Sequence, residues 1–372
     1  MNGYVLVKSY YGWGGDLAVL AEAINLASRN NLAVVVDWRG SFSNRVETEN
    51  VFDNLFNLSP SVLRANLCDL KDVSKIIPDY WRPYVFEPSP YTKEHPLTKV
   101  SRDDLDFNSI ENIKPYLVIL SRESSCFYKK EHQQEICDSY NKIIPNKNIQ
   151  ASIEEIHDSW NGHPTIGVHF RHGNGEPTVA YPDIKWYYRT IDYILLSRPE
   201  ALVFVSTDCF AALHEFQQRY GARIVSTKKK YLPVGVGGMH YYNTLEERLL
   251  SGQEAITDIW SLSKCDYFVG TKSFFSYAAN HLAGNFPKEK GFWYVNTLRS
   301  FKPSKDLAPI KSTKFRSLFE SINVSLDGIY IKNEEGLNFV YLQEKKLGPV
   351  HISDNIDYII KIAKSIQEIR LY

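Results

Sequence analysis

The sequence predicts an α/β protein built around parallel β-sheets, and three observations lead to that fold class. Continuous apolar runs, such as those at 32–36 and 201–206, have the character of strands buried in a parallel sheet. Segments with the helical spacing of apolar residues alternate with these runs along the chain. With 372 residues, of which 44% are hydrophobic and 23% charged, the chain is long enough for two such units.

The first part of the chain predicts a β-α-β unit followed by less regular structure. A glycine-rich segment at 11–16 separates the first strand from the first helix and is expected to form a turn. Prolines interrupt regular structure between about 45 and 115. The elements that we expect are a strand at 4–7, a helix at 17–27, strands at 32–36 and 116–120, and a helix at 129–142.

The second part repeats the alternation of strands and helices. A boundary between two α/β units is predicted at 145–163, around Pro145 and Gly162. After it we expect strands at 165–170, 201–206, 223–226 and 267–270, and helices at 185–197, 210–220, 254–263 and 273–283. From about 313 the pattern changes to a predicted hairpin, at 328–332 and 338–342, and a closing helix at 355–369.

The segment 165–177, TIGVHFRHGNGEP, carries the most informative pattern in the chain. Apolar and other residues alternate through 166–171, which is the period-two pattern of a half-buried strand. Open α/β sheets bind ligands at the carboxyl ends of their strands, and a guanidinium suits a phosphate because it donates in pairs and stays charged. The alternative is an ordinary strand whose polar residues face solvent. The side chains that gather at this strand end are His169, Arg171, His172 and Glu176.

Two other strands of the second unit are expected to end at the same sheet edge. Asp208 follows the strand at 201–206, and Asp258 lies within a later helix. Thr271 and Ser273 follow the strand at 267–270, where hydroxyls and amides at a helix N-terminus suit a phosphate. Taken singly, Asp258 is also explained as a paired helix residue and Ser273 as an ordinary N-cap. Their convergence on one edge favours the functional interpretation.

The glycine-rich segment at 12–16 allows two interpretations. Its place between a strand and a helix, with Asp37 at the end of the next strand, matches the spacing of a dinucleotide-binding turn. Leu17 takes the place of the third glycine, which disfavours a nicotinamide-dependent oxidoreductase. The other interpretation is a tight turn whose backbone amides point at an anion or a sugar hydroxyl. The residues of that turn are Gly14, Gly15 and Asp16.

A DxD-like cluster raises the question of a metal. Asp103, Asp104 and Asp106 resemble the carboxylates that hold a divalent cation against a diphosphate. However, no apolar strand precedes them, and SRDDLDF is equally the polar start of a helix. No His/Cys cluster in the sequence has the spacing of metal ligands. The sequence therefore predicts no bound metal.

Composition narrows the classes of partner. The 43 Lys and Arg residues balance the 43 Asp and Glu residues, so no global field favours nucleic acid. Aromatic residues reach 13%, and the 24 Tyr and 7 Trp combine an apolar face with a polar group, which suits sugar rings. Five cysteines without CxxC spacing indicate a reduced, cytoplasmic protein. We expect a soluble chain, because neither a signal peptide nor an apolar run of ~20 residues is evident.

The segment 166–176, IGVHFRHGNGE, resembles the signature of the NodZ-type α-1,6-fucosyltransferases of glycosyltransferase family 23. Other landmarks of that family follow in the same order at 35–41, 206–208 and 255–278. The resemblance implies a GT-B-like architecture, in which two Rossmann-like domains face a central cleft. The expected domains are an acceptor-side domain at 1–160, a GDP-sugar-binding domain at 161–312 and a C-terminal extension of a hairpin and a helix at 313–372.

The resemblance also implies roles for individual residues. Arg171 corresponds to the arginine that neutralises the β-phosphate, and Glu176 to the loop carboxylate that acts as base in animal relatives. His169 and Asp258 correspond to residues that contact the guanine. Two departures concern the donor site: His172 stands where animal relatives have a second basic residue, and Cys209 where they have a second acid. The remaining expected donor-binding residues are His172, Asp208, Thr271 and Ser273, and Gly14, Gly15 and Asp16 are expected on the acceptor side.

The activity implied is an inverting, metal-independent transfer of L-fucose from GDP-fucose to a saccharide acceptor, such as a GlcNAc-containing or bacterial surface glycan. Inverting transfer needs a base for the acceptor hydroxyl and a positive site for the departing diphosphate, and Arg171 can supply the latter without a metal. Two alternatives remain open. The chain transfers another GDP-linked sugar, or it is a non-catalytic glycan- or nucleotide-binding protein on the same fold.

Overall fold

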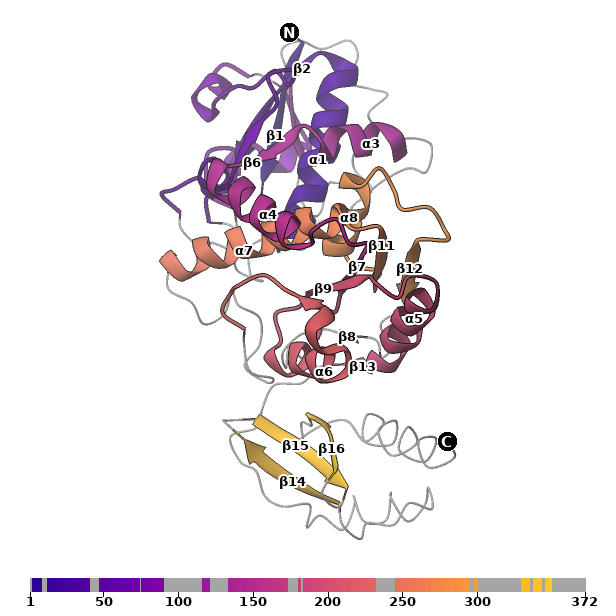
Figure 1. Cartoon of the computed structure of the whole chain (residues 1–372). Helices are drawn as coiled ribbons and strands as arrows, with labels where there is room; N and C mark the ends of the chain where they lie inside the picture. Colours follow the sequence, from indigo (N-terminus) through magenta and orange to yellow (C-terminus); the bar gives the residue numbers. More distant parts are fainter. Residues whose placement is uncertain are drawn as a thin grey trace.

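The structure of the chain is a computed structural model, shown in Figure 1. It describes residues 2–8, 12–40, 47–73, 75–89, 116–120, 133–172, 180–181, 183–231, 245–294, 298–299, 329–334, 337–342 and 345–349. The helices of this part of the chain are α1 (Trp13–Asn30), α2 (Val51–Leu55), α3 (Gln133–Tyr140), α4 (Lys147–Ser159), α5 (Ile184–Ser197), α6 (Phe210–Tyr220), α7 (Leu245–Ser263) and α8 (Phe274–Leu282). Short 3-10 helices lie at Leu67–Leu70, Asp79–Tyr84 and Gly221–Arg223.

Two parallel sheets organise these elements, which confirms the predicted α/β class. The first has the order β2-β1-β5-β4, formed by Leu32–Asp37, Gly3–Lys8, Tyr116–Leu120 and Lys75–Ile77. The second has the order β10-β9-β7-β11-β12, formed by Ile224–Val225, Leu202–Ser206, Thr165–His169, Tyr267–Thr271 and Gly291–Tyr294. Helices connect the successive strands of the second sheet, as parallel pairing requires.

Three small antiparallel sheets complete the described structure. They pair β3 (Phe56–Leu58) with β6 (Ile143–Pro145), β8 (Ala180–Tyr181) with β13 (Leu298–Arg299), and β14 (Ile329–Glu334) with β15 (Leu337–Leu342) and β16 (Lys345–Pro349). The pairing of β14 with β15 falls where the hairpin was predicted. The predicted closing helix at 355–369 lies outside the described residues.

The segment predicted as a boundary forms the helix α4. Asn146 caps it, because its side chain accepts a hydrogen bond from the Ile149 amide at 2.9 Å. Ile149 and Ile153 are buried one turn apart, which is the spacing of a helix face that packs on a core. Helix α4 packs against α7, so one face of this stretch contributes to the core while most of its residues are exposed.

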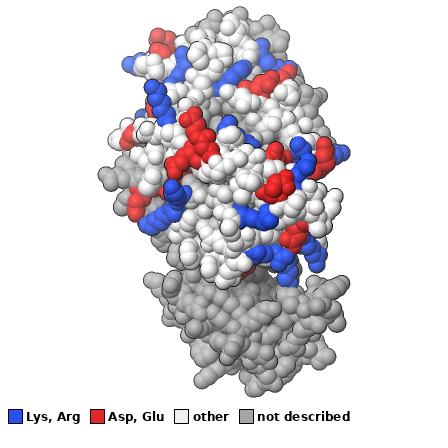
Figure 2. All heavy atoms as spheres, viewed as in Figure 1, with Lys and Arg blue, Asp and Glu red and all other residues white. Residues whose placement is uncertain are grey.

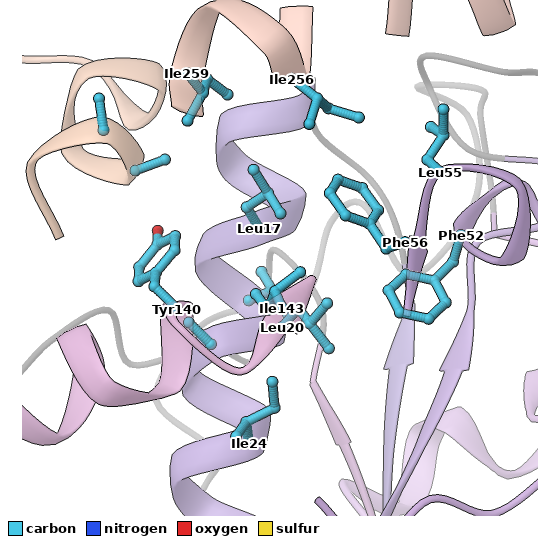
Figure 3. Close-up of a cluster of buried hydrophobic side chains, with 14 of the residues drawn as sticks. Leu17, Leu20, Ile24, Phe52, Leu55, Phe56, Tyr140, Ile143, Ile256 and Ile259 are labelled. Atoms are coloured by element: carbon cyan, nitrogen blue, oxygen red, sulfur yellow. The ribbon is translucent and has the colours of Figure 1, made fainter. Parts of the chain in front are cut away.

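One hydrophobic core joins the two sheets. Figure 1 shows α4, α7 and α8 between them, and Figure 3 shows Leu17 of α1 in the same cluster as Ile256 and Ile259 of α7. The cluster extends from Val5 in β1 to Phe268 in β11. Burial of each such side chain contributes ~1.5–3 kcal/mol, so the relative placement of the sheets is held by apolar packing.

The predicted turn at 11–16 is wrong from Trp13 onward, because helix α1 already begins there. The amides of Gly15 and Asp16 donate to the Gly12 carbonyl at 2.9 and 3.1 Å, so they are not available to an anion. Gly14 is instead required by packing: a Cβ on it would lie 2.4 Å from the Phe275 amide nitrogen of α8. The glycine allows two helix N-termini to approach closely.

Strand β7 is buried along its whole length, so the predicted half-buried strand is also wrong. It lies at the centre of the second sheet, between β9 and β11. On the face that was expected to be polar, a Cβ on Gly167 would lie 2.9 Å from Cys265 Sγ and 3.1 Å from Leu262 Cδ2. The alternation in this strand therefore reflects a close approach of α7 rather than contact with solvent.

Charged side chains of both signs share the described surface. Figure 2 shows positive and negative side chains interspersed over the described part of the face in view. Among the described residues, none of the helices has the length and apolar character needed to cross a bilayer.

Candidate functional site

The carboxyl ends of the central strands in the second sheet bring the predicted site residues together. His169 is the last residue of β7 and pairs in register with Ser206, the last residue of β9. Thr271 ends the neighbouring strand β11. Helix α7 brings Asp258 to Ser206, and helix α8 brings Ser276 to His169. The convergence on one sheet edge, which the sequence could only suggest, is thus present among the described residues.

His169 is held from three sides. Its Nδ1 lies 2.7 Å from Ser276 Oγ, and its ring stacks on Phe275 with centroids 4.5 Å apart. The Tyr187 hydroxyl donates to its backbone carbonyl at 3.0 Å. Burial, together with the charges of Arg171 and Lys229, lowers the pKa of His169 to about 3. The imidazole is therefore neutral at neutral pH and can donate from one nitrogen and accept at the other.

A chain of hydroxyls leads from the N-terminus of α8 to the ring of His169. Ser273 caps α8 and accepts from the Ser276 amide at 3.2 Å, so the N-cap interpretation is confirmed. The Ser273 hydroxyl donates to Ser276 Oγ at 3.2 Å. Ser276 Oγ in turn is the hydrogen-bond partner of His169 Nδ1, and this contact fixes the orientation of the ring.

Asp258 is the centre of a second buried network. Its Oδ2 accepts from Ser206 Oγ at 2.8 Å and lies 2.5 Å from Lys229 Nζ, and its Oδ1 accepts from the Thr227 hydroxyl. The side chains of Asp258 and Lys229 are only 2% and 8% exposed. Burial alone would lower the pKa of Lys229, but the charge and hydrogen bond of Asp258, together with Tyr231 and Asp208, outweigh it and raise that pKa. The pair is therefore an ion pair that compensates the desolvation of both charges.

Arg171 and Asp208 lie half-buried at the same edge. Burial raises the pKa of the Asp208 carboxyl, and the positive charges of Arg171 and Lys229 act against that rise. His172, next to Arg171, is buried, and burial lowers its pKa to about 4. Both histidines are therefore uncharged at neutral pH, so Arg171 and Lys229 supply the positive charge at this edge.

The other predicted site residues are either buried in the structure or lie outside the described residues. Thr271 is fully buried, and its Oγ1 has no hydrogen-bond partner within the described part of the chain. Gly14, Gly15 and Asp16 are buried in the first turn of α1, where Gly14 serves helix packing. Glu176 lies outside the described residues, as do Asp103, Asp104 and Asp106.

Lys229 and Ser276 are site residues that sequence reasoning missed. Lys229 is the middle member of three consecutive lysines at 228–230, a run that normally lies on the surface. Its position shortly after the strand β10 was the available signal. Ser276 lies three residues after the N-cap of α8, where only the contact with His169 distinguishes it from an ordinary helix residue.

At the carboxyl edge of the first sheet, charged side chains form ion pairs with one another. Lys8 Nζ lies 2.5 Å from Asp37 Oδ2 and from the Glu87 carbonyl, and Arg39 Nε lies 2.8 Å from Asp37 Oδ1. Burial alone would raise the pKa of Asp37, but the hydrogen bonds and charges of Arg39 and Lys8 lower it. These contacts tie the segment around Glu87 to the ends of β1 and β2.

Metal ligands are not gathered in the described part of the chain, where no three His, Cys, Asp or Glu side chains lie close enough together to hold an ion. Carboxylates at the second sheet edge are instead paired with cations, as the contact between Asp258 and Lys229 shows.

The buried histidines make the protein sensitive to acid. Burial lowers the pKa values of His169, His172 and His281 to about 3, about 4 and about 4, whereas an unfolded histidine titrates near ~6.5. Between these values the unfolded chain binds more protons than the folded one, so stability falls as the pH decreases below ~6.5. We expect a loss on the order of 1 kcal/mol per histidine at pH ~5.5.

Urea unfolding at neutral and mildly acid pH measures this effect. His281→Gln removes one of the three histidines. The difference in the free energy of unfolding between the two pH values should therefore shrink by about one third of the joint contribution of the three histidines. A difference unchanged in His281→Gln would contradict the neutral state of this buried ring.

Comparison with known proteins gives a consistent result. The family model described as nodulation protein Z (NodZ) matches residues 2–284. Nodulation protein Z of Sinorhizobium fredii is 26% identical over 300 residues, which cover 74% of this chain and 90% of the relative. Nodulation protein Z of Bradyrhizobium diazoefficiens is 24% identical over 298 residues, which cover 74% of this chain and 78% of the relative.

Solved structures show the same fold. A crystal structure of the fucosyltransferase NodZ from Bradyrhizobium superposes with a TM-score of 0.52 at 18% identity, over 75% of this chain and 93% of that one. A structure of NodZ α-1,6-fucosyltransferase soaked with GDP-fucose gives a TM-score of 0.51 at 19% identity, over 76% and 93% of the two chains. At these identities the superpositions establish the likeness of the fold.

Proposed function

The chain belongs to the nodulation protein Z (NodZ) family, and from this membership we propose that it is a glycosyltransferase that moves L-fucose from GDP-fucose to a saccharide acceptor. The observation that carries the proposal is the extent of the family match, residues 2–284, which includes the first parallel sheet, every strand of the second except β12, and the segment 166–176. A NodZ α-1,6-fucosyltransferase has been crystallised with GDP and another crystal was soaked with GDP-fucose, which supports this donor.

Arg171 is the proposed phosphate-binding residue of the donor site. It stands at the carboxyl end of β7, beside the buried and uncharged rings of His169 and His172. Since neither ring carries a charge at neutral pH and Lys229 is paired with Asp258, the guanidinium supplies the attraction for a diphosphate. Thr271 and Ser273, at the neighbouring strand end and helix N-terminus, complete the proposed phosphate side.

His169 and Asp258 are the proposed guanine-binding residues. The contact with Ser276 occupies Nδ1 of His169 and leaves Nε2 for a hydrogen bond with the base. Asp258 accepts hydrogen bonds, which suits the N–H groups of guanine. Asp208 adds a carboxylate near Arg171 and Lys229, where it balances the charge of the site before the donor binds.

The proposed reaction is inverting and needs no metal. Glu176 takes the proton of the acceptor hydroxyl while the hydroxyl oxygen attacks the anomeric carbon, and the bond to the diphosphate breaks. Arg171 stabilises the charge on the leaving diphosphate, which is usually the larger contribution to catalysis. A positioned base adds ~10²–10⁴-fold to the rate.

The proposed architecture is GT-B-like, with an acceptor-side domain at 1–160, a donor domain at 161–312 and a C-terminal extension at 313–372. Two parallel sheets, each with a set of polar side chains at its carboxyl edge, support this division. Cys68, Cys137, Cys209 and Cys265 are free, which supports a reducing, cytoplasmic location.

A thermal-shift screen of nucleotides tests the proposed donor. GDP should raise the melting temperature, whereas UDP, CMP and NAD at the same concentration should not. A ligand at about 100 times its dissociation constant adds ~2.7 kcal/mol to the folded state, which is readily detected. Stabilisation by NAD alone, or by every nucleotide equally, would refute a GDP-sugar donor.

A further inference from the structure

Three consecutive lysines have different environments. Lys228 and Lys230 have side chains 92% and 62% exposed and pair with Glu155 and Glu247 on the surface. Lys229, between them, is 8% exposed, and its Nζ lies 2.5 Å from Asp258 Oδ2. A lysine is rarely buried unless its charge is paired, so the position of Lys229 calls for an explanation beyond solubility.

The partner carboxylate is almost fully engaged by the protein. A carboxylate has about four acceptor positions, and at Asp258 three of them are taken by Lys229, Ser206 and Thr227. These donors reach it from the end of β9 and from the segment that follows β10. Because they bind both oxygens, these donors fix the orientation of the carboxyl group. About one acceptor position is left for a ligand.

Other charged and titratable groups face this ion pair from the surrounding elements. Electrostatic interactions connect Lys229 with His169 at the end of β7, with Asp208 after β9 and with Glu254 on α7. Its ammonium also lies 5.3 Å from the ring centroid of Tyr231, and Arg171 acts on the same His169 and Asp208. Lys229 thus occupies the middle of the proposed donor site.

We propose that Lys229 is a positioning residue for base recognition, which holds the Asp258 carboxylate charged and oriented so that it accepts a hydrogen bond from N1–H of guanine. The inference rests on the proposed use of a GDP-linked donor and names the residue that makes the donor specific. Adenine has no hydrogen at N1, so a fixed acceptor discriminates against it. Without a cation beside it, a buried carboxylate is costly and its protonated form is favoured. The protonated carboxyl carries a hydrogen that would face N1–H of guanine, so it would not accept this hydrogen bond.

Calorimetric titration of the full-length chain with GDP and with ADP tests this inference. In Lys229→Met, which keeps the apolar length of the side chain, we expect GDP affinity to fall about tenfold or more. ADP affinity should change by less than about twofold, because ADP does not use this acceptor. Lys228→Met is the matched control, since it removes the neighbouring surface charge and should bind both nucleotides as the wild type does.

A double-mutant cycle shows whether Lys229 acts through Asp258. If it does, Asp258→Asn with Lys229→Met should bind GDP no more weakly than Asp258→Asn alone. Additive losses would overturn the inference. So would an equal loss for GDP and ADP in Lys229→Met, which would indicate a general disturbance of local structure, or GDP binding equal to that of Lys228→Met.

The design separates this inference from the proposed function. Failure of the wild-type chain to bind GDP would refute the donor assignment before any variant is compared, whereas GDP binding that survives in Lys229→Met refutes only the role of Lys229. Circular dichroism confirms that each variant is folded. Should Lys229→Met not fold, Lys229→Gln removes the charge and keeps a polar side chain of similar length. It should lose GDP affinity selectively, and an unchanged preference for GDP over ADP would overturn the inference.

Discussion

Arg171→Ala is expected to abolish measurable fucosyl transfer and to weaken GDP binding. Because His169 and His172 are neutral, they add no positive charge beside Arg171 at the donor edge, and the nearby cation Lys229 is already paired with Asp258. Loss of a group that stabilises the charge developing in the transition state typically costs ~10²–10³-fold in kcat. Radiolabelled fucose transfer and GDP titration measure the two effects.

Two matched variants sharpen this prediction. Arg171→Lys keeps the charge but loses the bidentate geometry, and we expect it to recover GDP affinity more than it recovers rate. Glu176→Gln removes the proposed base and should lower kcat while GDP affinity stays within about twofold of the wild type, since the base does not contact the donor phosphates. Full transfer activity in Arg171→Ala would refute the assignment of the phosphate site.

Gly14→Ala is expected to destabilise the folded protein by roughly 2 kcal/mol or more. The new Cβ would lie 2.4 Å from the Phe275 amide nitrogen and 2.6 Å from the Phe274 carbonyl carbon, and backbone atoms cannot turn away as a flexible side chain can. Alanine stabilises a helix by ~1 kcal/mol relative to glycine. A net loss of stability would therefore show that the steric clash outweighs the higher helix propensity of alanine. The midpoint of thermal or urea unfolding measures it.

The same substitution is also expected to reach the donor site. Displacement of the start of α8 moves Phe275, which stacks on His169, and Ser276, which lies 2.7 Å from its Nδ1. GDP affinity should therefore fall together with stability. Gly12→Ser is the control, because a Cβ on Gly12 meets no atom within 4 Å and serine suits the N-cap of α1. Equal midpoints for the wild type and Gly14→Ala would contradict the close helix contact.

Local periodicity was sufficient for much of the fold. The strand β5 and the helix α6 have the predicted bounds, and the strands β7, β9 and β11 agree within a residue. Helix α4 was missed, because Pro145 and Gly162 indicated a linker while Ile149 and Ile153 supplied only two apolar positions of a helix face. Helix α1 was predicted too short, because glycines lower helix propensity and nothing local reveals that Gly14 is needed for a contact with α8.

For the site, the sequence placed His169 and Arg171 at a strand end and identified Ser273 and Asp258 as candidates. It could not show their partners. The contact between His169 and Ser276 joins residues separated by 107 positions, and that between Lys229 and Asp258 joins residues separated by 29. Surface and buried lysines look the same in a run of three, so only packing distinguishes Lys229 from Lys228 and Lys230.

The sequence by itself determined the α/β class, the order of strands and helices, and the chemistry at the end of β7, because each of these depends on residues that are neighbours in the sequence. The tertiary structure decided which hydroxyl orients His169, which cation neutralises Asp258, and why position 14 is glycine. These depend on helices α7 and α8 meeting α1 and the second sheet in one shared core. Such contacts arise only when the whole chain is packed, since desolvation and close approach are properties of the assembled interior.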